Sequence, residues 1–458
     1  MNRKWGIPKS YIGVIAVLAA IIMSVIDGTV VNVALPTLSQ QFGASPSQTI
    51  WVVNAYQLVI TVSLLSFASL GDIYGYRKVF LCGVAVFGMA SLACALSDSL
   101  WVLVGARVAQ GFGAAAVMSV NTALIRLIYP PEFIGRGMGI NAMVVSVSVA
   151  AGPSLAGAIL SVASWHWLFA INIPIALIAF FTGRAFLPDN PPRQRRWRFD
   201  KVSAVGSALT FGLLIYTLEG LAHRQNREMI AVQLALLAVI GYFFIRRQKK
   251  QEAPILPVDL LRIPIFSLSI GTSVCSFTAQ MLAMVSLPFL FQDFMGLSVV
   301  ETGLLLTPWP LATIVAAPIA GRLVEKVHPG LLGGIGMAVF AVGIYLLLSL
   351  PGDPSHADIL WRMAVCGAGF GLFQTPNNVT IVSSAPKARS GGASGMLGTA
   401  RLLGQTLGTT LVALMFRLGL SENASHDCLT LAMGFALLAA AVSSLRLSQA
   451  TPVKKVNP

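Results

Sequence analysis

Long apolar runs alternate with short polar segments along almost the whole chain. A membrane-spanning helix needs about 20 mostly apolar residues to cross roughly 30 Å of hydrocarbon. Fourteen runs of this length occur, at 11–34, 48–70, 78–97, 100–123, 137–161, 166–187, 202–221, 229–247, 264–291, 300–322, 330–350, 359–382, 391–417 and 428–447. The pattern therefore predicts an all-α membrane protein with 14 transmembrane helices.

The composition agrees with this prediction. Of the 458 residues, 56% are apolar and 10% are charged, and the mean hydropathy is +0.78. An ordinary soluble domain has about 25% charged residues, so lipid must solvate much of this chain.

The placement of the basic residues predicts the orientation of the chain, because Lys and Arg accumulate on the cytoplasmic side of a membrane. With the N-terminus inside, 25 of the 31 basic residues fall in cytoplasmic segments. Both termini are expected in the cytoplasm, with the chain in a bacterial cytoplasmic (inner) membrane. The basic surplus is then a topology signal, and no nucleic-acid partner is expected.

An internal repeat divides the chain. Residues 68–72 align with 321–325, and 135–137 align with 388–390, both at an offset of 253 residues. Repeats of this kind are common in transporters. The predicted parts are an N-terminal six-helix bundle (1–187), an inserted helix pair with basic cytoplasmic flanks (188–262) and a C-terminal six-helix bundle (263–458), which together form a monomer.

Four segments carry characteristic glycine and charge patterns, namely Asp27–Pro36, Gly71–Lys78, Arg107–Gly113 and Ala151–Gly157. In this order they resemble the opening, the signature loop, the helix-4 motif and the antiporter motif of the major facilitator superfamily, in its fourteen-span drug/proton antiporter branch. The resemblance covers nearly the whole chain and implies the major facilitator fold. One departure is Ala68, where the signature loop usually begins with Gly.

Two charged residues lie inside predicted spans where a charge is costly. Asp27 must be protonated, paired or in a wet cavity, and since burial favours the neutral acid, it is a candidate proton carrier. Arg107 cannot discharge and needs an anion or several carbonyls. We expect the two to share a central cavity, with Gln110 and Asn32 bonded nearby. The repeat aligns Asp27 with the neutral Gln280, so coupling is expected in the N-terminal half. A packing Asp and an Arg held by carbonyls are the plainer alternatives.

The charged loop after the second span is expected to fix helices rather than to bind substrate. Asp72 can accept hydrogen bonds from backbone N–H groups at the start of another helix, and the Gly391–Gly392 opening offers them. The resemblance implies a latch between the halves, against the alternative of an ordinary solvated loop. The motif residues assigned to this role are Asp72, Gly75, Arg77, Lys78 and, by the repeat, Glu325.

Two further spans have features typical of moving or tightly packed helices. Gly152, Pro153 and Gly157 remove one backbone donor and allow close helix approach, which favours a gating role for this span. Arg401 lies among glycines in the thirteenth predicted span. It is assigned to the gating residues, although it could equally face a wet vestibule or bind a substrate anion.

Aromatic, thioether and amide side chains are candidates for a substrate cavity. They suit a bulky lipophilic cation through cation–π and dispersion contacts. Ordinary packed helix faces are the alternative for each of them. The candidates are Asn32, Trp51, Asn54, Tyr56, Gln110, Phe277, Gln280, Met281, Met284, Phe373, Gln374 and Asn377.

These observations favour a transporter with no enzymatic site, cofactor or metal. Energy must come from an ion gradient, because the chain contains no nucleotide-binding loop. The expected function is proton-coupled export of lipophilic, cationic drugs or toxic compounds. One alternative is a facilitator or proton-coupled transporter of a specific small metabolite, in which Asp27 and Arg107 bind the substrate. Another is a non-transporting sensor or scaffold.

Overall fold

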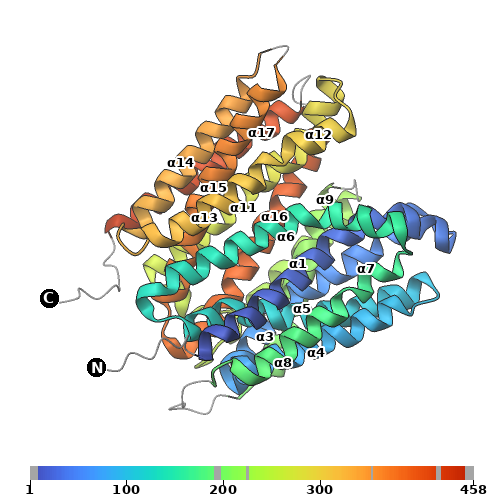
Figure 1. The fold of residues 1–458 in the computed structure, drawn as a ribbon. Coiled ribbons are helices and arrows are strands. Elements are labelled where there is room, and N and C mark those ends of the chain that lie inside the picture. Colours follow the sequence, from blue (N-terminus) through green and yellow to red (C-terminus); the bar gives the residue numbers. More distant parts are fainter. Residues whose placement is uncertain (1–8, 190–197, 223–225, 352–353, 419–423, 449–458) are drawn as a thin grey trace, which may run out of the picture. The chain divides into compact units, whose positions relative to one another are not determined.

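The computed structural model describes residues 9–189, 198–222, 226–351, 354–418 and 424–448, and these ranges contain helices but no strand (Figure 1). The helices are α1 (Lys9–Phe42), α2 (Pro46–Thr49), α3 (Trp51–Tyr74), α4 (Tyr76–Ala95), α5 (Leu100–Ile128), α6 (Ile134–Val162), α7 (His166–Ala170), α8 (Asn172–Phe186), α9 (Lys201–Ala222), α10 (Arg227–Gln248), α11 (Pro264–Phe289), α12 (Val299–Leu306), α13 (Pro308–Leu323), α14 (Pro329–Leu348), α15 (His356–Ser384), α16 (Ser390–Leu418) and α17 (Ala424–Leu445).

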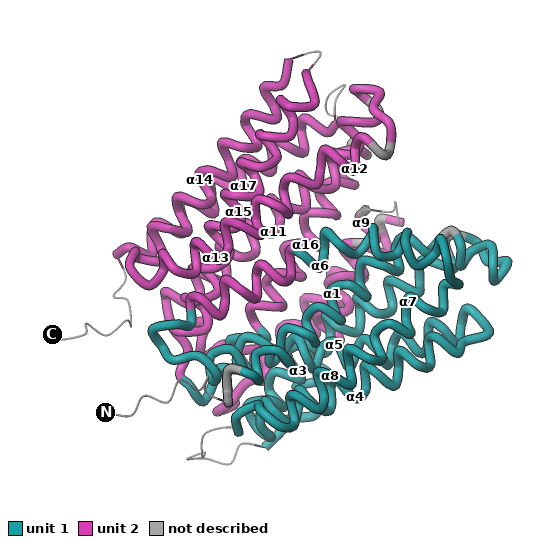
Figure 2. The backbone as a smooth tube through the Cα atoms, in the orientation of Figure 1, with its two compact units in different colours: residues 1–134, 147–208, 387–395 teal, residues 135–146, 209–386, 396–458 magenta. Residues whose placement is uncertain are grey.

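The chain forms two compact units (Figure 2). Unit 1 comprises residues 1–134, 147–208 and 387–395, and unit 2 comprises residues 135–146, 209–386 and 396–458. The start of α16 thus groups with unit 1, and the start of α6 groups with unit 2. The division of the chain at residues 187 and 262 remains a prediction.

The same helix pairings recur in the two units. In unit 1, α1 packs on α8 and α5, α4 packs on α5 and α8, and α3 packs on α5. In unit 2, α11 packs on α17 and α15, α14 packs on α15 and α17, and α13 packs on α15. Each pairing in the first set has its counterpart in the second. The structure therefore repeats, at the level of helix packing, the internal similarity found in the sequence.

Twelve helices in the described ranges are long and apolar enough to cross a membrane, where the sequence predicted fourteen. The prediction of fourteen is not supported, because α15 and α16 do not qualify. Both are long, with 29 residues each. Amides and charged residues in α15, and glycines, hydroxyls and Arg401 in α16, make these two helices less apolar than the other predicted spans.

A single glycine joins α3 to α4, where the sequence predicted a longer loop. Gly75 has φ = 108°, a conformation that side chains other than glycine rarely adopt. Its N–H donates to the carbonyl of Gly71 and closes the end of α3. The sharp turn leaves Asp72 at the end of one helix and Tyr76 at the start of the next, and their side chains meet.

A buried arginine fastens the end of α17 to its neighbours in unit 2. Arg446 donates to Ser269 Oγ of α11 at 3.0 Å and to Asn377 Oδ1 of α15 at 2.7 Å, and also to the hydroxyl of Ser443. His328, at the start of α14, accepts the N–H of Gly330 on Nδ1. Burial, and secondly the charge of Arg446, lower the pKa of His328, which favours the neutral ring that this cap requires.

Candidate functional site

The two intramembrane charges of the N-terminal half form an ion pair inside unit 1. Asp27 of α1 is 1% exposed and Arg107 of α5 is fully buried. A terminal guanidinium nitrogen of Arg107 donates to Asp27 Oδ2. Because a single buried charge is far more costly than a bonded pair, each residue makes the other tolerable at this depth.

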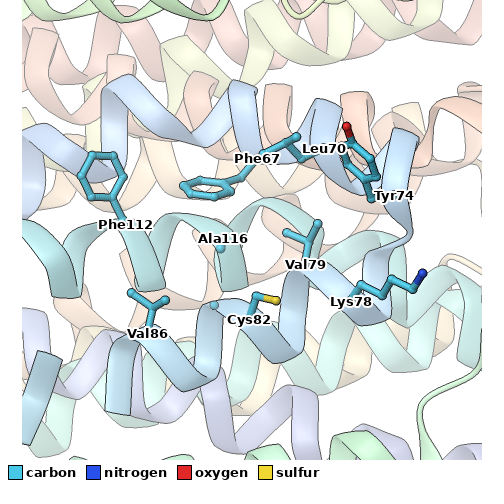
Figure 3. A pocket seen from close by; sticks show the side chains of 10 residues that line it. Phe67, Leu70, Tyr74, Lys78, Val79, Cys82, Val86, Phe112 and Ala116 are labelled. Atoms are coloured by element: carbon cyan, nitrogen blue, oxygen red, sulfur yellow. The ribbon is translucent and has the colours of Figure 1, made fainter. Parts of the chain in front are cut away.

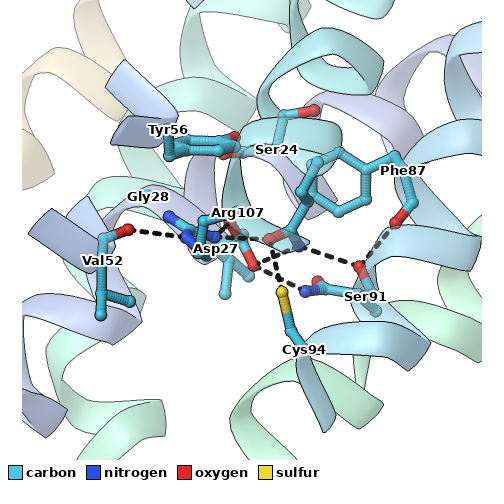
Figure 4. Close-up of polar contacts among 12 residues, drawn as sticks. Ser24, Asp27, Gly28, Val52, Tyr56, Phe87, Ser91, Cys94 and Arg107 are labelled. Atoms are coloured by element: carbon cyan, nitrogen blue, oxygen red, sulfur yellow. Dashed lines mark hydrogen bonds and ion pairs between the residues drawn. The ribbon is translucent and has the colours of Figure 1, made fainter. Parts of the chain in front are cut away.

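Polar contacts surround Asp27 and Arg107 (Figure 4), and two amide side chains complete the shell around Asp27. Gln110 Nε2 and Asn172 Nδ2 both donate to Asp27 Oδ1 at 2.8 Å. Gln110 also donates to Ser91 Oγ at 2.9 Å and accepts from Arg107 at 2.6 Å. Both carboxylate oxygens therefore accept from N–H donors. This pattern fits an ionised Asp27, since a protonated carboxyl group would have to donate one bond.

Aromatic rings and one carbonyl hold the guanidinium of Arg107. Its Nε donates to the carbonyl of Val52 at 2.9 Å. The guanidinium carbon lies 4.0 Å from the ring centroid of Tyr56 and 5.7 Å from that of Phe169. The stacked Tyr56 adds a cation–π attraction, of about 2 kcal/mol or more in a desolvated site.

Two atoms of this cluster are buried and have no hydrogen-bond partner in the described parts of the chain. They are the second terminal nitrogen of Arg107 and Oδ1 of Asn172. An unpaired buried polar atom costs about 1–3 kcal/mol, so native structures keep few of them. The site thus has one spare donor and one spare acceptor, which a change of protonation could use.

Sequence reasoning found part of this cluster and missed part. Gln110 lies where it was expected. Asn32 does not, because its exposed side chain donates to the carbonyl of Gly28 in its own helix. Asn172 and Ser91 were missed. Asn172 lies at the break between α7 and α8, inside the run 166–187 that was predicted as one continuous helix. An amide within this apolar run is the signal that could have revealed it.

The carboxylate of Asp72 docks onto the start of α16. Its Oδ1 accepts the N–H of Gly391 at 2.7 Å, and its Oδ2 accepts that of Gly392 at 2.9 Å. Tyr76 donates its hydroxyl to Asp72 at 2.7 Å, and Arg389 lies 3.4 Å away. The predicted contact with the Gly391–Gly392 opening is confirmed. A Cβ on Gly391 would lie 2.5 Å from Asp72 Oδ1, so glycine is required there.

Ala68, the departure from the signature loop, packs against a second glycine of the same helix. A Cβ on Gly395 would lie 2.4 Å from the Cβ of Ala68. The helices α3 and α16 keep their close approach because Gly395 leaves the space that Ala68 fills.

Glu325, the repeat counterpart of Asp72, forms its own ion pair inside unit 2. Arg136, at the start of α6, binds it with two parallel bonds of 2.9 and 3.0 Å. The repeat aligns Arg136 with Arg389, which lies beside Asp72. Equivalent residues thus form equivalent pairs, although the side chain of Arg136 is half exposed whereas Arg389 is buried.

The basic residues of the motif point elsewhere. Arg77 pairs with Asp189 at 2.8 Å. Lys78 is exposed and stands at one end of an otherwise apolar groove of about 290 Å³, which Phe67, Tyr74 and Phe112 also line (Figure 3). Of the residues predicted to function, only Lys78 borders this groove. It is therefore separate from the site around Asp27.

The glycines of α6 differ in what they contact. A Cβ on Gly152 would lie 2.0 Å from Thr29 Oγ1 of α1, and Pro153 follows inside the helix. Close approach is therefore observed at Gly152. At Gly157 the prediction of close packing is wrong, because no atom lies within 4 Å of the position of its Cβ.

The predicted cavity residues have diverse surroundings. Phe277 and Phe373 are buried in the core of unit 2, where both contact the ring of Phe370. Asn377 bonds Arg446, and Tyr56 belongs to the Arg107 cluster. Trp51 is exposed. The remaining candidates are half-buried, namely Asn54, Gln280, Met281, Met284 and Gln374.

Comparison with known families agrees with this architecture. Residues 17–409 match the model of the Major Facilitator Superfamily. The chain belongs to this superfamily. It is accordingly a multi-pass membrane transporter of small molecules with an all-helical fold, and members of this family are in general not enzymes.

Three relatives align over most of their length. The Escherichia coli (strain K12) protein described as uncharacterized transporter YebQ is 59% identical, covering 97% of each chain. The riboflavin transporter RibZ of Clostridioides difficile (strain 630) is 28% identical, covering 92% of this chain and 90% of RibZ. The multidrug efflux pump LfrA of Mycolicibacterium smegmatis is 31% identical, covering 88% of this chain and 80% of LfrA.

Proposed function

We propose that this chain is a proton-coupled antiporter that exports amphipathic, drug-like compounds across the bacterial cytoplasmic membrane. The observation that carries the proposal is the buried pair of Asp27 and Arg107. Intramembrane ionisable residues are rare and mark proton and substrate pathways. Similarity to the efflux pump LfrA supports the direction of transport.

The geometry suggests how a proton would change the site. An ionised Asp27 neutralises Arg107 and accepts three N–H bonds. Protonation removes the negative charge, leaves Arg107 unpaired and requires an acceptor for the new O–H. Rotation of the Asn172 amide would offer its orphan Oδ1 as that acceptor. Proton binding thereby favours a different arrangement of α1, α5 and α8, which is the coupling that an antiporter needs.

We propose that the contacts of Asp72 and Glu325 stabilise one access state of the transport cycle. Asp72 is buried and holds α3 against the start of α16, and Glu325 holds the end of α13 against the start of α6. Alternating access requires such contacts to break and form again in each cycle.

The orientation of the chain is part of the proposal. The distribution of basic residues supports a cytoplasmic position for both termini. We propose that α15 and α16 cross the membrane with the twelve more apolar helices. Each has 29 residues and a length of about 43 Å, and the polar side chains of both are largely covered by protein. This arrangement would match the fourteen-span drug/proton antiporter branch.

Inverted membrane vesicles test the function directly. Vesicles with the full-length protein are energised, and the uptake of rhodamine 123 and of fluorescein is followed with and without a protonophore. The proposal expects uptake of at least one dye that collapses with the protonophore and is lost in Asp27→Asn. Uptake that survives the protonophore unchanged would refute it.

A facilitator of a specific metabolite is the second candidate, because RibZ is described as a riboflavin transporter. In this case Asp27 and Arg107 would bind a polar substrate rather than a proton. Riboflavin uptake into the same vesicles, insensitive to the protonophore and lost in Arg107→Gln, would favour this function over proton-coupled export.

A further inference from the structure

Arg401 of α16 has no hydrogen-bond or ion-pair partner among the residues that the structure describes. Its Nε is buried without any hydrogen bond, and its side chain forms no ion pair with a described residue. The residue as a whole is half-buried, and its two terminal nitrogens reach accessible space. Arg107, by contrast, has a carboxylate, a carbonyl and an amide as acceptors.

No carboxylate lies within the described part of α16 or of α11, against which α16 packs. The described parts of α11, α13, α14 and α16 contain no Asp or Glu, and those of α15 and α17 have only Asp358 and Asp427, each in the first turn. An uncompensated arginine in a membrane protein costs at least several kcal/mol unless it reaches water or an anion. Arg401 is therefore expected to contact water or an anion.

Arg401 lies in the interior of α16. It stands 11 residues after the start of the helix and 17 residues before its end, or roughly 17 and 25 Å from the two ends. With α16 crossing the membrane as proposed above, the guanidinium requires a polar space, because lipid offers it no acceptor.

The packing of α16 directs this guanidinium toward α11 in unit 2. A Cβ on Gly404 would lie 2.6 Å from the carbonyl oxygen of Val274, and Thr278 Oγ1 donates to the carbonyl of Gly404 at 3.2 Å. Arg401 precedes Gly404 by one turn and shares its side of the helix. Gln405, four residues after Arg401, lies on the same side and is also half-buried.

We propose that Arg401 is an anion-binding residue of the substrate site and that the substrates carry a negatively charged carboxylate or phosphate group. A guanidinium offers parallel N–H donors that match such groups with two bonds. Gln405 supplies a neutral amide beside them. Two of the aromatic residues that favoured a cationic substrate, Phe277 and Phe373, are instead buried in the unit 2 core, and a third, Tyr56, stacks on Arg107. The inference rests on the proposed export function and narrows its substrates to organic anions and zwitterions.

Two dyes with one core and opposite charges test the inference without any gradient. Fluorescein is anionic at pH 7.5, whereas rhodamine 123 is cationic, and both contain a xanthene ring. Binding to the purified full-length protein in neutral detergent is measured by fluorescence anisotropy. The proteins are the wild type, Arg401→Gln, Arg401→Lys and the control Arg262→Gln, which removes an exposed arginine just before α11.

We expect the wild type to bind fluorescein more tightly than rhodamine 123. Arg401→Gln should weaken fluorescein binding at least about 10-fold, the effect of one charge-assisted hydrogen bond, and leave rhodamine 123 binding unchanged or tighter. The fluorescein affinity of Arg401→Lys should lie between those of the wild type and Arg401→Gln, because lysine keeps the charge but loses the paired donors. Arg262→Gln should match the wild type.

Three results would overturn the inference. The first is no binding of fluorescein to the wild type, and the second is equal binding by the wild type and Arg401→Gln. The third is displacement of fluorescein by phosphatidylglycerol at a low molar ratio, which would assign the arginine to a lipid headgroup. Monodisperse elution of each variant establishes that it is folded. If Arg401→Gln does not fold, the fluorescein affinities of the wild type and Arg401→Lys are compared instead. Because no gradient is used, these outcomes are independent of whether transport is proton-coupled.

Discussion

Replacing Asp27 with asparagine changes the charge of the buried cluster without changing its shape. The carboxylate accepts bonds on both oxygens, from Arg107 on one and from Gln110 and Asn172 on the other. An amide has one acceptor and one donor. In either orientation of the new side chain, its NH₂ group faces an N–H donor, from Arg107 in one case and from Gln110 and Asn172 in the other. The guanidinium of Arg107 also loses its only carboxylate partner among the described residues.

The expected loss of unfolding free energy is about 3–5 kcal/mol, the usual cost of removing one member of a buried ion pair. Arg107→Gln should cost a similar amount, because it strands the carboxylate. The double variant removes both charges, so its loss should be smaller than the sum of the two single losses by at least about 2 kcal/mol. Unfolding by SDS in mixed micelles measures all three.

Transport separates the structural role of the pair from its role in proton coupling. The double variant should lose less stability than the two single losses combined, but it should not regain proton-driven dye uptake, since no titrating carboxylate remains at the site. Asp98→Asn, at an exposed position before α5, serves as the control and should change neither property. Undiminished pH-driven uptake by Asp27→Asn would refute the reasoning, and additive losses in the double variant would refute the energetic account of the pair.

Three further predictions concern the contacts that fix helix ends. Gly391→Ala should prevent Asp72 from docking onto the start of α16, because the new Cβ would lie 2.5 Å from a carboxylate oxygen. Dye uptake should then fall at least about 10-fold. The control Gly434→Ala, with open space around it, should leave uptake unchanged. Arg446→Gln should lower the free energy of unfolding by about 3 kcal/mol in the SDS assay, since it removes buried bonds to α11 and α15. His328 has a lowered pKa, so its contribution to stability is present above a pH of about 6.5 and is lost as the pH falls; His328→Asn, which caps without titrating, should therefore lose less stability than the wild type between pH 7.5 and pH 5.

Much of the fold could be predicted from sequence, because the length of an apolar run fixes both its helical state and its membrane location. The number of membrane-spanning helices was predicted less well than their positions. Helices α15 and α16 carry polar residues that other helices cover, so their apolarity falls although their length does not. The break between α7 and α8 was also hidden, since it lies inside one continuous apolar run.

The site was predicted as far as its two charges, Gln110 and Tyr56. A charge inside an apolar run can be recognised at once, which is why Asp27 and Arg107 were found. Short polar side chains give a weaker signal because many of them bond to their own helix, as Ser24 does to the carbonyl of Ala20. Asn32 bonds in this way and Asn172 does not, and only the structure distinguishes the two.

The comparison of the two units indicates why a single carboxylate suffices for the proposed coupling. In unit 1, α4 and α5 meet where Gly83 approaches Gly113, and in unit 2, α14 and α15 meet where Gly336 approaches Gly369. Arg107 lies six residues before Gly113, and Met363 lies six residues before Gly369, so the two positions are equivalent. Met363 is fully buried in an apolar core. The same junction therefore holds a neutralised ion pair in one unit and only apolar packing in the other. Since Asp27 of unit 1 has Arg107 as its counter-charge and the aligned position of unit 2 holds the apolar Met363, we expect proton binding to take place in unit 1.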